Sequence, residues 1–423
     1  MCCASCVEPQ NPLAWGLVPV FHKFNRTYYC YYIYKTYLLP VGPGGTKGRN
    51  AMNFSCEKAL LQAAINTAGR TVASKSSIAA LEGVLVEAKD GKLTLTGYNL
   101  ETGIETTVEA QVGEEGSIVL SPRLFGDIVR NLPDDVVTYT STGLNVNIKC
   151  GMSDYNILGL PADEFPELPV VDDGNGFFIP QSKLKSMIAQ TIFAVSDNES
   201  RPIHTGSLFE VEGDTLTMVS VDGYRLALRR EQLTSTCGAN AFSFVVPGAA
   251  LREVEKICPD SDEPVSVTQG ARHILFQAGN TVLIARRLEG EFLNYKQTIP
   301  RQNGVKVFGE KRALQTCVDR VSLIISEKLK SPLRCVFADG ELRVRTKTAV
   351  GDAFDSCVVE GNGKDLEIGF NDRYLTEALR AAPADRLRLE LNTPTAPCLL
   401  LPEKESDESF LYMVLPVRLK AGD

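Results

Sequence analysis

The sequence has few of the residues and segments on which catalysis, metal binding or membrane insertion usually depends. Its 423 residues include three histidines (His22, His204 and His273) and one tryptophan, which leaves little room for His-based catalysis or a His-rich metal site. No run of 18 apolar residues is present, so we expect no membrane-spanning helix. Of the twelve cysteines, the eight from Cys56 onward stand singly, with no Cys-x-x-Cys pair among them, which is typical of reduced thiols in a cytosolic protein.

The sequence motifs of common enzyme classes are also missing. The chain has no P-loop, no Gly-x-Ser-x-Gly segment and no His-x-x-x-His segment. Its closely spaced aspartates, at 134–135, 172–173 and 260–262, lie in turn-like stretches, where Asp is favoured because its side chain bonds to the nearby backbone. We therefore expect no catalytic residue, no metal site and no cofactor.

What the chain does contain is enough apolar sequence for several hydrophobic cores. Hydrophobic residues make up 44% of the chain and charged residues 23%, and 44 Lys and Arg face 52 Asp and Glu for a net charge of -8. These values are typical of a globular protein, and the length predicts two to four domains.

Residues 1–51 differ from the rest of the chain. They hold six of the thirteen tyrosines and carry a charge of +4, and they end in the Gly- and Pro-rich stretch 40–50. Regular, periodic sequence begins only at Met52, so we interpret 1–51 as an N-terminal extension that is disordered or as a mis-called start. The alternative is an appendage that binds a soft metal, although the spacing of its four candidate ligands matches no zinc pattern: Cys2, Cys3, Cys6 and His22.

An internal repeat organises the chain from Met52 onward. Six segments share the order apolar strand, polar or Pro break, amphipathic helix, and they begin near residues 54, 119, 178, 245, 307 and 368. The helical stripes recur with the spacing of one buried helix face, and three of them are Leu60, Leu61, Ala64, Ile65 and Ala68; Leu124, Phe125, Ile128, Val129 and Leu132; and Tyr374, Leu375, Ala378, Leu379 and Ala382. Pro180 and Pro247 stand where helices of the repeat can begin.

Alternating strands between these helices give the period of the larger repeat. Strands are predicted at 92–96, 215–220 and 341–346, each after a turn that contains Gly91, Gly213 or Gly340. Their leucines at 93, 216 and 342 are separated by about 125 residues. The sequence therefore predicts an α+β chain of three tandem copies of one internally doubled domain, at 52–172, 177–298 and 299–423.

Similar domains in tandem either extend or close, and a two-fold dimer would supply two identical closures. If the helices line the concave side, their net charge indicates what kind of molecule the ring can enclose. The six helical segments carry thirteen Lys and Arg against eight Asp and Glu, an excess of +5 in an acidic chain. A positive helical lining is typical of contact with the backbone of a polyanion, without reading of its sequence.

Five segments then identify a family resemblance. They are LGLPADEFP at 158–166, VSVDGYRLA at 219–227, EGEFLNY at 289–295, IGFN at 368–371 and YMVLPVRL at 412–419. From Met52 to about Leu419 the chain resembles the bacterial DNA polymerase III beta subunits, the sliding clamps.

The resemblance implies a ring homodimer of six DNA-clamp domains, with helices lining the inside and β-sheets outside. Duplex DNA would pass through the ring without sequence recognition, and the ring would tether the replicative polymerase catalytic subunit as its processivity factor. It also implies a non-catalytic, cytoplasmic subunit of the DNA polymerase III holoenzyme that binds the clamp loader and other clamp-motif peptides, with no membrane partner. The alternative function is a peptide-binding scaffold that does not encircle DNA.

The resemblance also assigns three sets of site residues. The DNA-binding set is Lys75, Arg123, Arg130, Asn198 and Arg201. The partner-peptide pocket is Val221, Gly223, Tyr224, Arg225, Leu226, Leu293, Gln297, Thr298, Thr395, Met413, Val414, Leu415 and Pro416. The dimer interface is Tyr155 and Ile157 of the first domain with Leu323 and Ile324 of the third.

Overall fold

The computed structural model describes residues 19–24, 27–32, 51–171, 174–326, 328 and 331–419, with side chains from residue 51 onward. The chain divides into two units, 1–49 and 50–423, and each is described by itself. The first unit contains one antiparallel hairpin of β1 (Pro19–Phe24) and β2 (Thr27–Tyr32). The rest of 1–50 and the proposed ligands Cys2, Cys3, Cys6 and the His22 side chain lie outside the described residues, so the interpretation of this segment stays a prediction.

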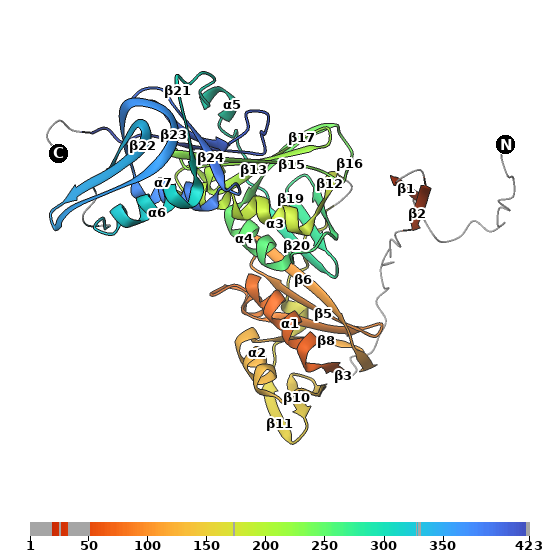
Figure 1. Cartoon of the computed structure of the whole chain (residues 1–423). Helices are drawn as coiled ribbons and strands as arrows, with labels where there is room; N and C mark the ends of the chain where they lie inside the picture. Colours follow the sequence, from red (N-terminus) through yellow and green to blue (C-terminus); the bar gives the residue numbers. More distant parts are fainter. Residues whose placement is uncertain are drawn as a thin grey trace, which may run out of the picture. The chain divides into compact units, whose positions relative to one another are not determined.

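The second unit repeats one order of elements three times (Figure 1). The first copy comprises β3 (Ala51–Glu57), α1 (Lys58–Ala68), η1 (Gly69–Thr71), η2 (Ala79–Glu82), β4 (Val84–Lys89), β5 (Lys92–Tyr98), β6 (Thr102–Glu109), β7 (Gln111–Glu114), β8 (Gly116–Leu120), α2 (Pro122–Asn131), β9 (Val136–Thr142), β10 (Asn145–Cys150), β11 (Ser153–Leu158) and η3 (Ala162–Glu164). The second comprises β12 (Asn175–Pro180), α3 (Gln181–Ala189), η4 (Ile192–Ala194), η5 (Pro202–Thr205), β13 (Gly206–Glu212), β14 (Thr215–Val221), β15 (Arg225–Gln232), β16 (Ser235–Cys237), β17 (Ala241–Pro247), α4 (Gly248–Ile257), β18 (Pro264–Gln269), β19 (His273–Ala278) and β20 (Thr281–Arg286).

The third copy follows the short helix α5 (Tyr295–Thr298) and merges several strands into two long ones. It comprises β21 (Val305–Glu310), α6 (Lys311–Ser322), β22 (Leu333–Thr348), β23 (Gly351–Phe370), α7 (Asp372–Ala381), β24 (Arg386–Leu391), β25 (Cys398–Pro402) and β26 (Phe410–Val414). Each copy thus has two main helices, and the two helices of each pair contact one another. The α+β repeat predicted from the sequence is confirmed.

All six predicted helices form, but two predicted core residues are wrong. Leu61 of α1 and Phe125 of α2 are fully buried as expected, whereas Leu60 is 41% exposed and Leu124 is 48% exposed. Both are the first member of an adjacent apolar pair. Neighbouring helical positions are turned by about 100°, so both members of a pair fit inside the buried stripe only when the stripe is wide.

Local sequence explains where the helices and turns lie. The Ser121 side chain accepts a hydrogen bond from the Leu124 N–H, and Asn371 does the same for the Tyr374 N–H, so α2 and α7 begin with capped backbone donors. Pro180 and Pro247 directly precede the first residues of α3 and α4. The predicted turn glycines at 91, 213 and 340 have φ of +73°, +59° and +71°, a region that glycine enters without steric cost.

Each copy has its own hydrophobic core, but the sheets run across the copies. The sheet orders are β11-β10-β9-β3-β7, β16-β12-β18-β19-β20-β6-β5-β4-β8 and β17-β13-β14-β15-β26-β25-β24-β21-β23-β22. The first copy joins the second through β6 and β20, and the second joins the third through β15 and β26. Both junctions are antiparallel strand pairs.

Candidate nucleic-acid and partner interfaces

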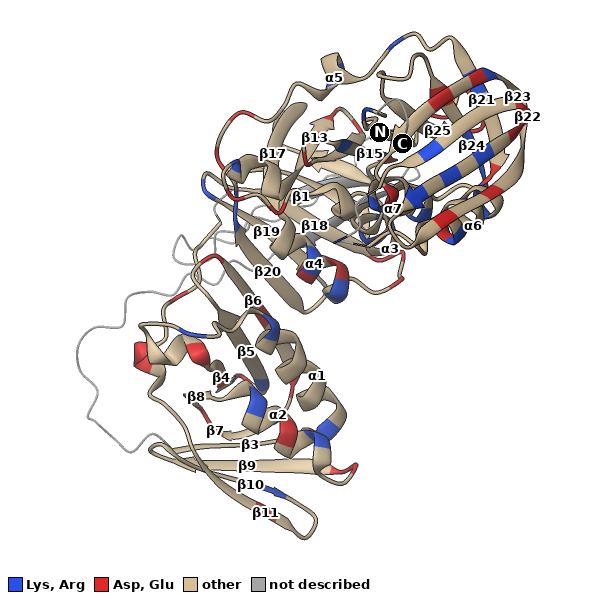
Figure 2. Cartoon of the chain, turned by 90° about the vertical axis from the view of Figure 1, so that its left-hand side faces the viewer, with Lys and Arg blue, Asp and Glu red and all other residues tan. Residues whose placement is uncertain are grey.

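Most cations of the six helices are neutralised locally. Of the thirteen, eight form ion pairs with acidic side chains: Lys58, Arg70, Arg130, Lys183, Lys185, Lys256, Arg320 and Arg373. The Lys311 ammonium donates to the backbone carbonyls of Arg380 and Ala382 at the end of α7. Both signs of charge are visible on α4 and α6 in Figure 2.

Four of the thirteen helix cations are exposed arginines with no acidic partner among the described side chains. They lie on α2, α4, α6 and α7 and are Arg123, Arg252, Arg312 and Arg380. The predicted set contained only the first of them. Of the other three, only Arg312 has no acid three or four residues away in the sequence, whereas Arg252 has Glu255 and Arg380 has Glu377 at that spacing. The structure was therefore needed to show that Arg252 and Arg380 form no ion pair.

The five residues of the predicted DNA-binding set are all exposed. Arg130 lies at the end of α2 and pairs with Asp127 at 3.0 Å, which reduces its availability to a phosphate. Asn198 and Arg201 lie in the loop between η4 and η5, where the Asn198 side-chain oxygen accepts the Ser200 N–H at 3.0 Å. Lys75 lies in the loop after η1, and Arg123 is the second residue of α2.

The predicted peptide pocket falls on the junction of the second and third copies. An apolar cluster there is formed by β13, β14, β15, β17, β25, β26 and the segment around α5. Its buried members include Val221, Leu226, Leu228, Tyr295, Leu399 and Met413, and Ile299, Leu401, Leu411 and Leu415 pack against it. The junction therefore places Val221, Leu226, Met413 and Leu415 of the predicted set together.

A cavity of about 430 Å³ adjoins this cluster. Leu228, Ile299, Leu401 and Leu411 line it with Tyr295, and charged side chains surround them. The resemblance did not name these four apolar residues. Leu228 and Leu411 share a strand face with Leu226 and Met413 because they are two residues away, so alternation in the sequence could have indicated them.

The remaining predicted pocket residues lie around the cluster or on the other side of the sheet. Tyr224 is 61% exposed and stacks on Tyr374 with ring centroids 5.9 Å apart. Gly223, Leu293, Gln297, Thr298 and Thr395 are exposed, and Pro416 is half-buried. Val414 is fully buried, within the core of the third copy.

Arg225 is buried between the second and third copies rather than open to the apolar cluster. Its Nε donates to Asp222 at 2.8 Å, its Nη1 pairs with Glu377 of α7, and its guanidinium lies 4.5 Å from the centroid of the Tyr374 ring. Burial raises the pKa of Glu377, but the hydrogen bonds from Arg225 and Arg373 outweigh it and hold the pKa below its ordinary value. This network of charged hydrogen bonds stabilises the junction between the second and third copies.

Charged groups also hold α5 against the second copy. The Tyr295 hydroxyl donates to Glu210 at 2.6 Å, and the Lys296 ammonium pairs with Glu210 at 2.9 Å and with Glu212 at 3.1 Å. Burial and the bond to Glu210 raise the pKa of Tyr295, and the bond to Glu210 also raises the pKa of Lys296. The linker beside the apolar cluster is thus fixed in place.

Of the predicted dimer residues, Tyr155 and Ile157 lie on the edge strand β11, and Leu323 and Ile324 directly follow α6. Two strand edges have no partner within the described chain. Strand β11 pairs only with β10, and residues 351–358 of β23 pair only with 341–348 of β22. Large apolar side chains are exposed at these edges and beside α6: Tyr155, Leu158, Leu323, Phe354 and Val358. Ile157 and Ile324 are half-buried. Phe354 and Val358 were not predicted, because the long strand β23 has no matching apolar pattern in the sequence.

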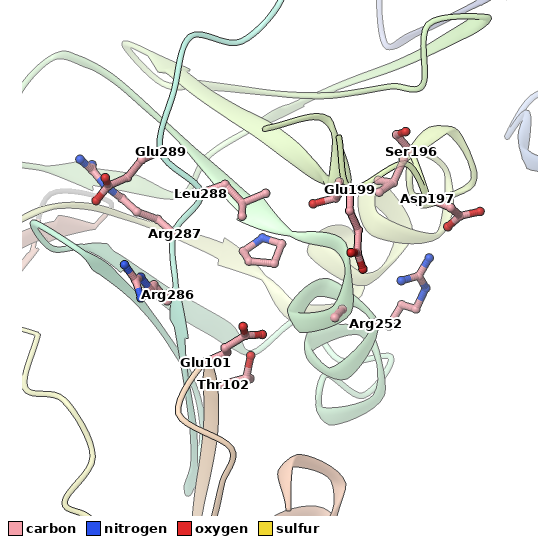
Figure 3. Close-up of a pocket in the computed structure, with 14 residues that line it drawn as sticks. Glu101, Thr102, Ser196, Asp197, Glu199, Arg252, Arg286, Arg287, Leu288 and Glu289 are labelled. Carbon is pink, nitrogen blue, oxygen red and sulfur yellow. The ribbon is translucent and has the colours of Figure 1, made fainter. Parts of the chain in front are cut away.

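A further cavity of about 620 Å³ lies where the first and second copies meet (Figure 3). Its lining includes four acids (Glu101, Asp197, Glu199 and Glu289) and three arginines (Arg252, Arg286 and Arg287). The mixture of signs does not select an anionic or a cationic ligand. Within the described residues there is no group of three or more His, Cys, Asp or Glu that could hold a metal ion, and none of the helices described has the length and apolar character needed to cross a membrane.

Comparisons with known proteins agree over most of the second unit, from residue 52 to residue 418. Three family models match consecutive segments: the N-terminal domain of the DNA polymerase III beta subunit at 52–169, its central domain at 178–294 and its C-terminal domain at 296–418. The beta sliding clamp of Synechococcus elongatus is 31% identical over 378 residues, which cover 88% of this chain and all of the relative.

Solved structures of sliding clamps match a similar share of this chain. The DNA polymerase sliding clamp of Bacillus subtilis superposes with a TM-score of 0.82 at 28% identity, and covers 87% of this chain and all of that one. The sliding clamp of Pseudomonas aeruginosa bound to griselimycin gives a TM-score of 0.81 at 27% identity with the same coverage. The three copies are therefore three tandem clamp domains.

Proposed function

Because the chain belongs to the DNA polymerase III beta subunit family, the bacterial sliding clamps, we propose that two copies close head to tail into a ring around duplex DNA. The ring tethers the replicative polymerase as a cytoplasmic, non-catalytic subunit of the DNA polymerase III holoenzyme, and the clamp loader and other peptides bind the same pocket. The domains of this ring are 52–172, 177–298 and 299–423.

The main support for a closed ring is that the two junctions between domains within one chain have the same structure. In each, the fourth strand of one domain (β6 or β15) pairs with the last strand of the next (β20 or β26). In each, an arginine of the earlier domain also meets a glutamate on the second helix of the later one, Arg70 with Glu253 and Arg225 with Glu377. A third junction of this kind needs the equivalent strand of domain three, which is the first part of β23, and the last strand of domain one.

These are the two strands, 351–358 and β11, whose outer edges have no partner in the part of the chain that the structure describes. They belong to opposite ends of one chain, so a second copy supplies the partner for each, and two-fold symmetry closes both contacts at once. In the internal junctions Thr102 lies opposite Ala285 and Arg225 opposite Val414. We apply this register to the equivalent positions of β23 and of β11 in the second copy. Gly351 then lies opposite Ile157 of the partner subunit, and Ala353 lies opposite Tyr155 of the partner subunit.

The ring holds DNA by enclosure, so its contacts with DNA need only be weak. The helix cations are mostly paired, and the arginines without an acidic partner are one each on α2, α4, α6 and α7. Sparse cations attract the phosphate backbone without fixing the position of the duplex. Lys75, Asn198 and Arg201 add polar contacts from loops.

The partner pocket is the apolar cluster at the junction of domains two and three, together with its adjoining cavity of about 430 Å³. An apolar floor with polar groups at its edge suits a short peptide anchored by Leu or Phe. Arg225 and Val414 support this site from behind, because they face the helices rather than the cluster.

Retention on circular DNA tests the proposal. The chain, loaded onto a nicked circle by a clamp loader, should stay bound through gel filtration and be released when the circle is cut once. Equal retention before and after cutting would contradict enclosure, and failure to dimerise would favour the peptide-binding scaffold.

A further inference from the structure

Four of the eight cysteines in the described residues gather in the third domain. Cys317 lies on α6, Cys335 on β22, Cys357 on β23 and Cys398 on β25. Two of them, Cys317 and Cys357, line one cavity of about 510 Å³ between α6 and β23. The other two are buried in the domain core. None of them has a role in the proposed clamp function.

The Cys317 and Cys357 side chains line this cavity together, and each is the main influence on the pKa of the other. The next contact between the same two elements is an ion pair of Arg320 with Asp355 at 3.2 Å, three residues along the helix and two along the strand. The helix and the strand are therefore held side by side at the thiols. Cys317 is 2% exposed and Cys357 is half-buried, so the outer thiol is open to small reagents through the cavity.

The two thiols differ in acidity in a way that suits stepwise oxidation. Interaction with the neighbouring Cys317 thiol lowers the pKa of Cys357, against the opposing effects of burial and Asp355. The same interaction, followed by burial, raises the pKa of Cys317. Since the thiolate is the nucleophile, the half-buried Cys357 is the thiol that reacts first.

We propose that Cys317 and Cys357 form a redox-active dithiol, which a hydroperoxide converts into a disulfide joining α6 to the edge strand 351–358. The Cys357 thiolate attacks the peroxide oxygen, the O–O bond breaks, and an alcohol or water leaves after taking up a proton, which yields a sulfenic acid. The Cys317 sulfur then attacks the Cys357 sulfur and loses its proton, and water leaves. The two thiols are oxidised by two electrons and the hydroperoxide is reduced by two.

The neighbouring cysteines do not compete for this role. Cys335 and Cys398 are fully enclosed, and burial raises the pKa of Cys335 strongly and that of Cys398 to about 12. Cys237 on β16 is exposed, but it belongs to the second domain and has no cysteine beside it in the described chain. It can be oxidised but cannot close a disulfide within the domain.

The position of the dithiol gives oxidation a consequence for the ring. The disulfide ties α6 to residues 351–358, the strand that pairs with β11 of the second copy, and this part of the inference rests on the proposed function. A tie that holds a binding strand in place reduces the ordering needed on association. The oxidised dimer should therefore dissociate several-fold more slowly than the reduced one.

Peptide mapping tests the site itself. The reduced full-length chain is treated with hydrogen peroxide, its remaining thiols are alkylated, and the digest is searched for a linked pair of peptides containing residues 317 and 357. The pair should dominate in the wild type and in Cys237→Ser, and it should be absent from Cys317→Ser and Cys357→Ser. In Cys317→Ser the sulfenic acid of Cys357 should instead be trapped by dimedone.

Absence of the linked pair in a wild type whose Cys237 is oxidised would overturn the dithiol. Cys317→Ala serves as a second variant in case serine is not tolerated at this buried position, and its thermal midpoint in reductant reports on folding. Subunit exchange between labelled dimers then tests the consequence. Equal exchange rates for reduced and fully disulfide-linked wild type would overturn the effect on the ring while leaving the dithiol standing, and a chain that never dimerises would count against the proposed function alone.

Discussion

Arg225 shows how a single side chain can hold two domains together. Its side chain is 4% exposed and lies between Asp222 of its own domain and Glu377 of the next, with Tyr374 against its guanidinium. A buried cation is stable only where its charge is matched and its donors are used. The strength of the junction between domains two and three therefore depends on Glu377.

Glu377→Gln should lower the free energy of unfolding by about 2 kcal/mol, because a buried charge-assisted hydrogen bond is removed while Asp222 still compensates Arg225. Urea unfolding followed by circular dichroism measures the change. Arg373→Gln is the matched control, since Arg373 binds the same carboxylate from a 66% exposed position and an exposed pair contributes about 0–1 kcal/mol. Equal losses of stability in the two variants would contradict the role given to Arg225.

The same carboxylate predicts a dependence on pH. The pKa of Glu377 is lower in the folded chain than its ordinary value of 4.5. The stabilisation it supplies is then fully present above about pH 4.5 and is lost as the pH falls toward the folded pKa. The difference in unfolding free energy between wild type and Glu377→Gln should shrink below pH 4.5, and a difference that grows there would contradict the assigned shift.

The apolar cluster makes a separate prediction about peptide binding. Met413→Ala together with Leu415→Ala removes side chains that face the proposed pocket, so the affinity for a Leu- or Phe-containing clamp-binding peptide should fall about tenfold or more, at roughly 0.8 kcal/mol per buried methylene. Fluorescence anisotropy measures the binding, and the dimer should be unaffected. Leu144→Ala, which alters an exposed leucine of domain one, is the control. Unchanged peptide affinity in the double variant would contradict the proposed pocket.

The residue scale also shows what the sequence could and could not predict about the site. Met413 and Val414 are neighbours in the predicted pocket, yet one faces the apolar cluster and the other the domain core, as strand alternation requires. That distinction was available from the sequence. The contact of Arg225 with Tyr374 and Glu377 was not, because about 150 residues separate them and neither helix nor strand period relates such distant positions.

At the scale of elements, the sequence predicted most where a period repeats. The six helices and the strands after Gly91, Gly213 and Gly340 follow from spacing alone. The short helix α5 and the fusion of strands into β22 and β23 were not predicted, since a four-residue helix has too few residues for a stripe and a long strand can bend without a local signal. Phe354 and Val358 were missed for this reason.

The edge strands without a partner in the described chain lead to a prediction about dimer formation. Phe354→Lys places a charge on the edge 351–358, where the proposed contact with β11 of the second copy would desolvate it. Phe354 is 65% exposed in the single chain, so folding should be unaffected while the dimer dissociation constant rises at least about tenfold. Analytical ultracentrifugation measures both states. Val136→Lys on β9, at 48% exposure, is the control for adding a charge, and a similar effect there would show that charge alone weakens the dimer.

At the scale of the whole molecule, the distribution of charge matters more than its amount. The chain carries a net charge of -8, so a polyanion is repelled unless cations are concentrated where it lies. The four helix arginines without acidic partners supply such positions, but weakly. This arrangement fits a ring that meets DNA through a few phosphate contacts and keeps it by enclosure.

Replacing Arg123, Arg252, Arg312 and Arg380 by Gln separates these two effects. Direct binding to linear duplex DNA should weaken, and the slope of log affinity against log salt should become shallower by roughly 0.9 for each phosphate that the variant no longer neutralises. Rings already closed on a circle should still be retained at moderate salt, because escape requires opening of a strand junction and not the breaking of ion pairs. A variant that slides off intact circles as fast as off cut ones would mean that the arginines, and not the closed ring, hold the DNA.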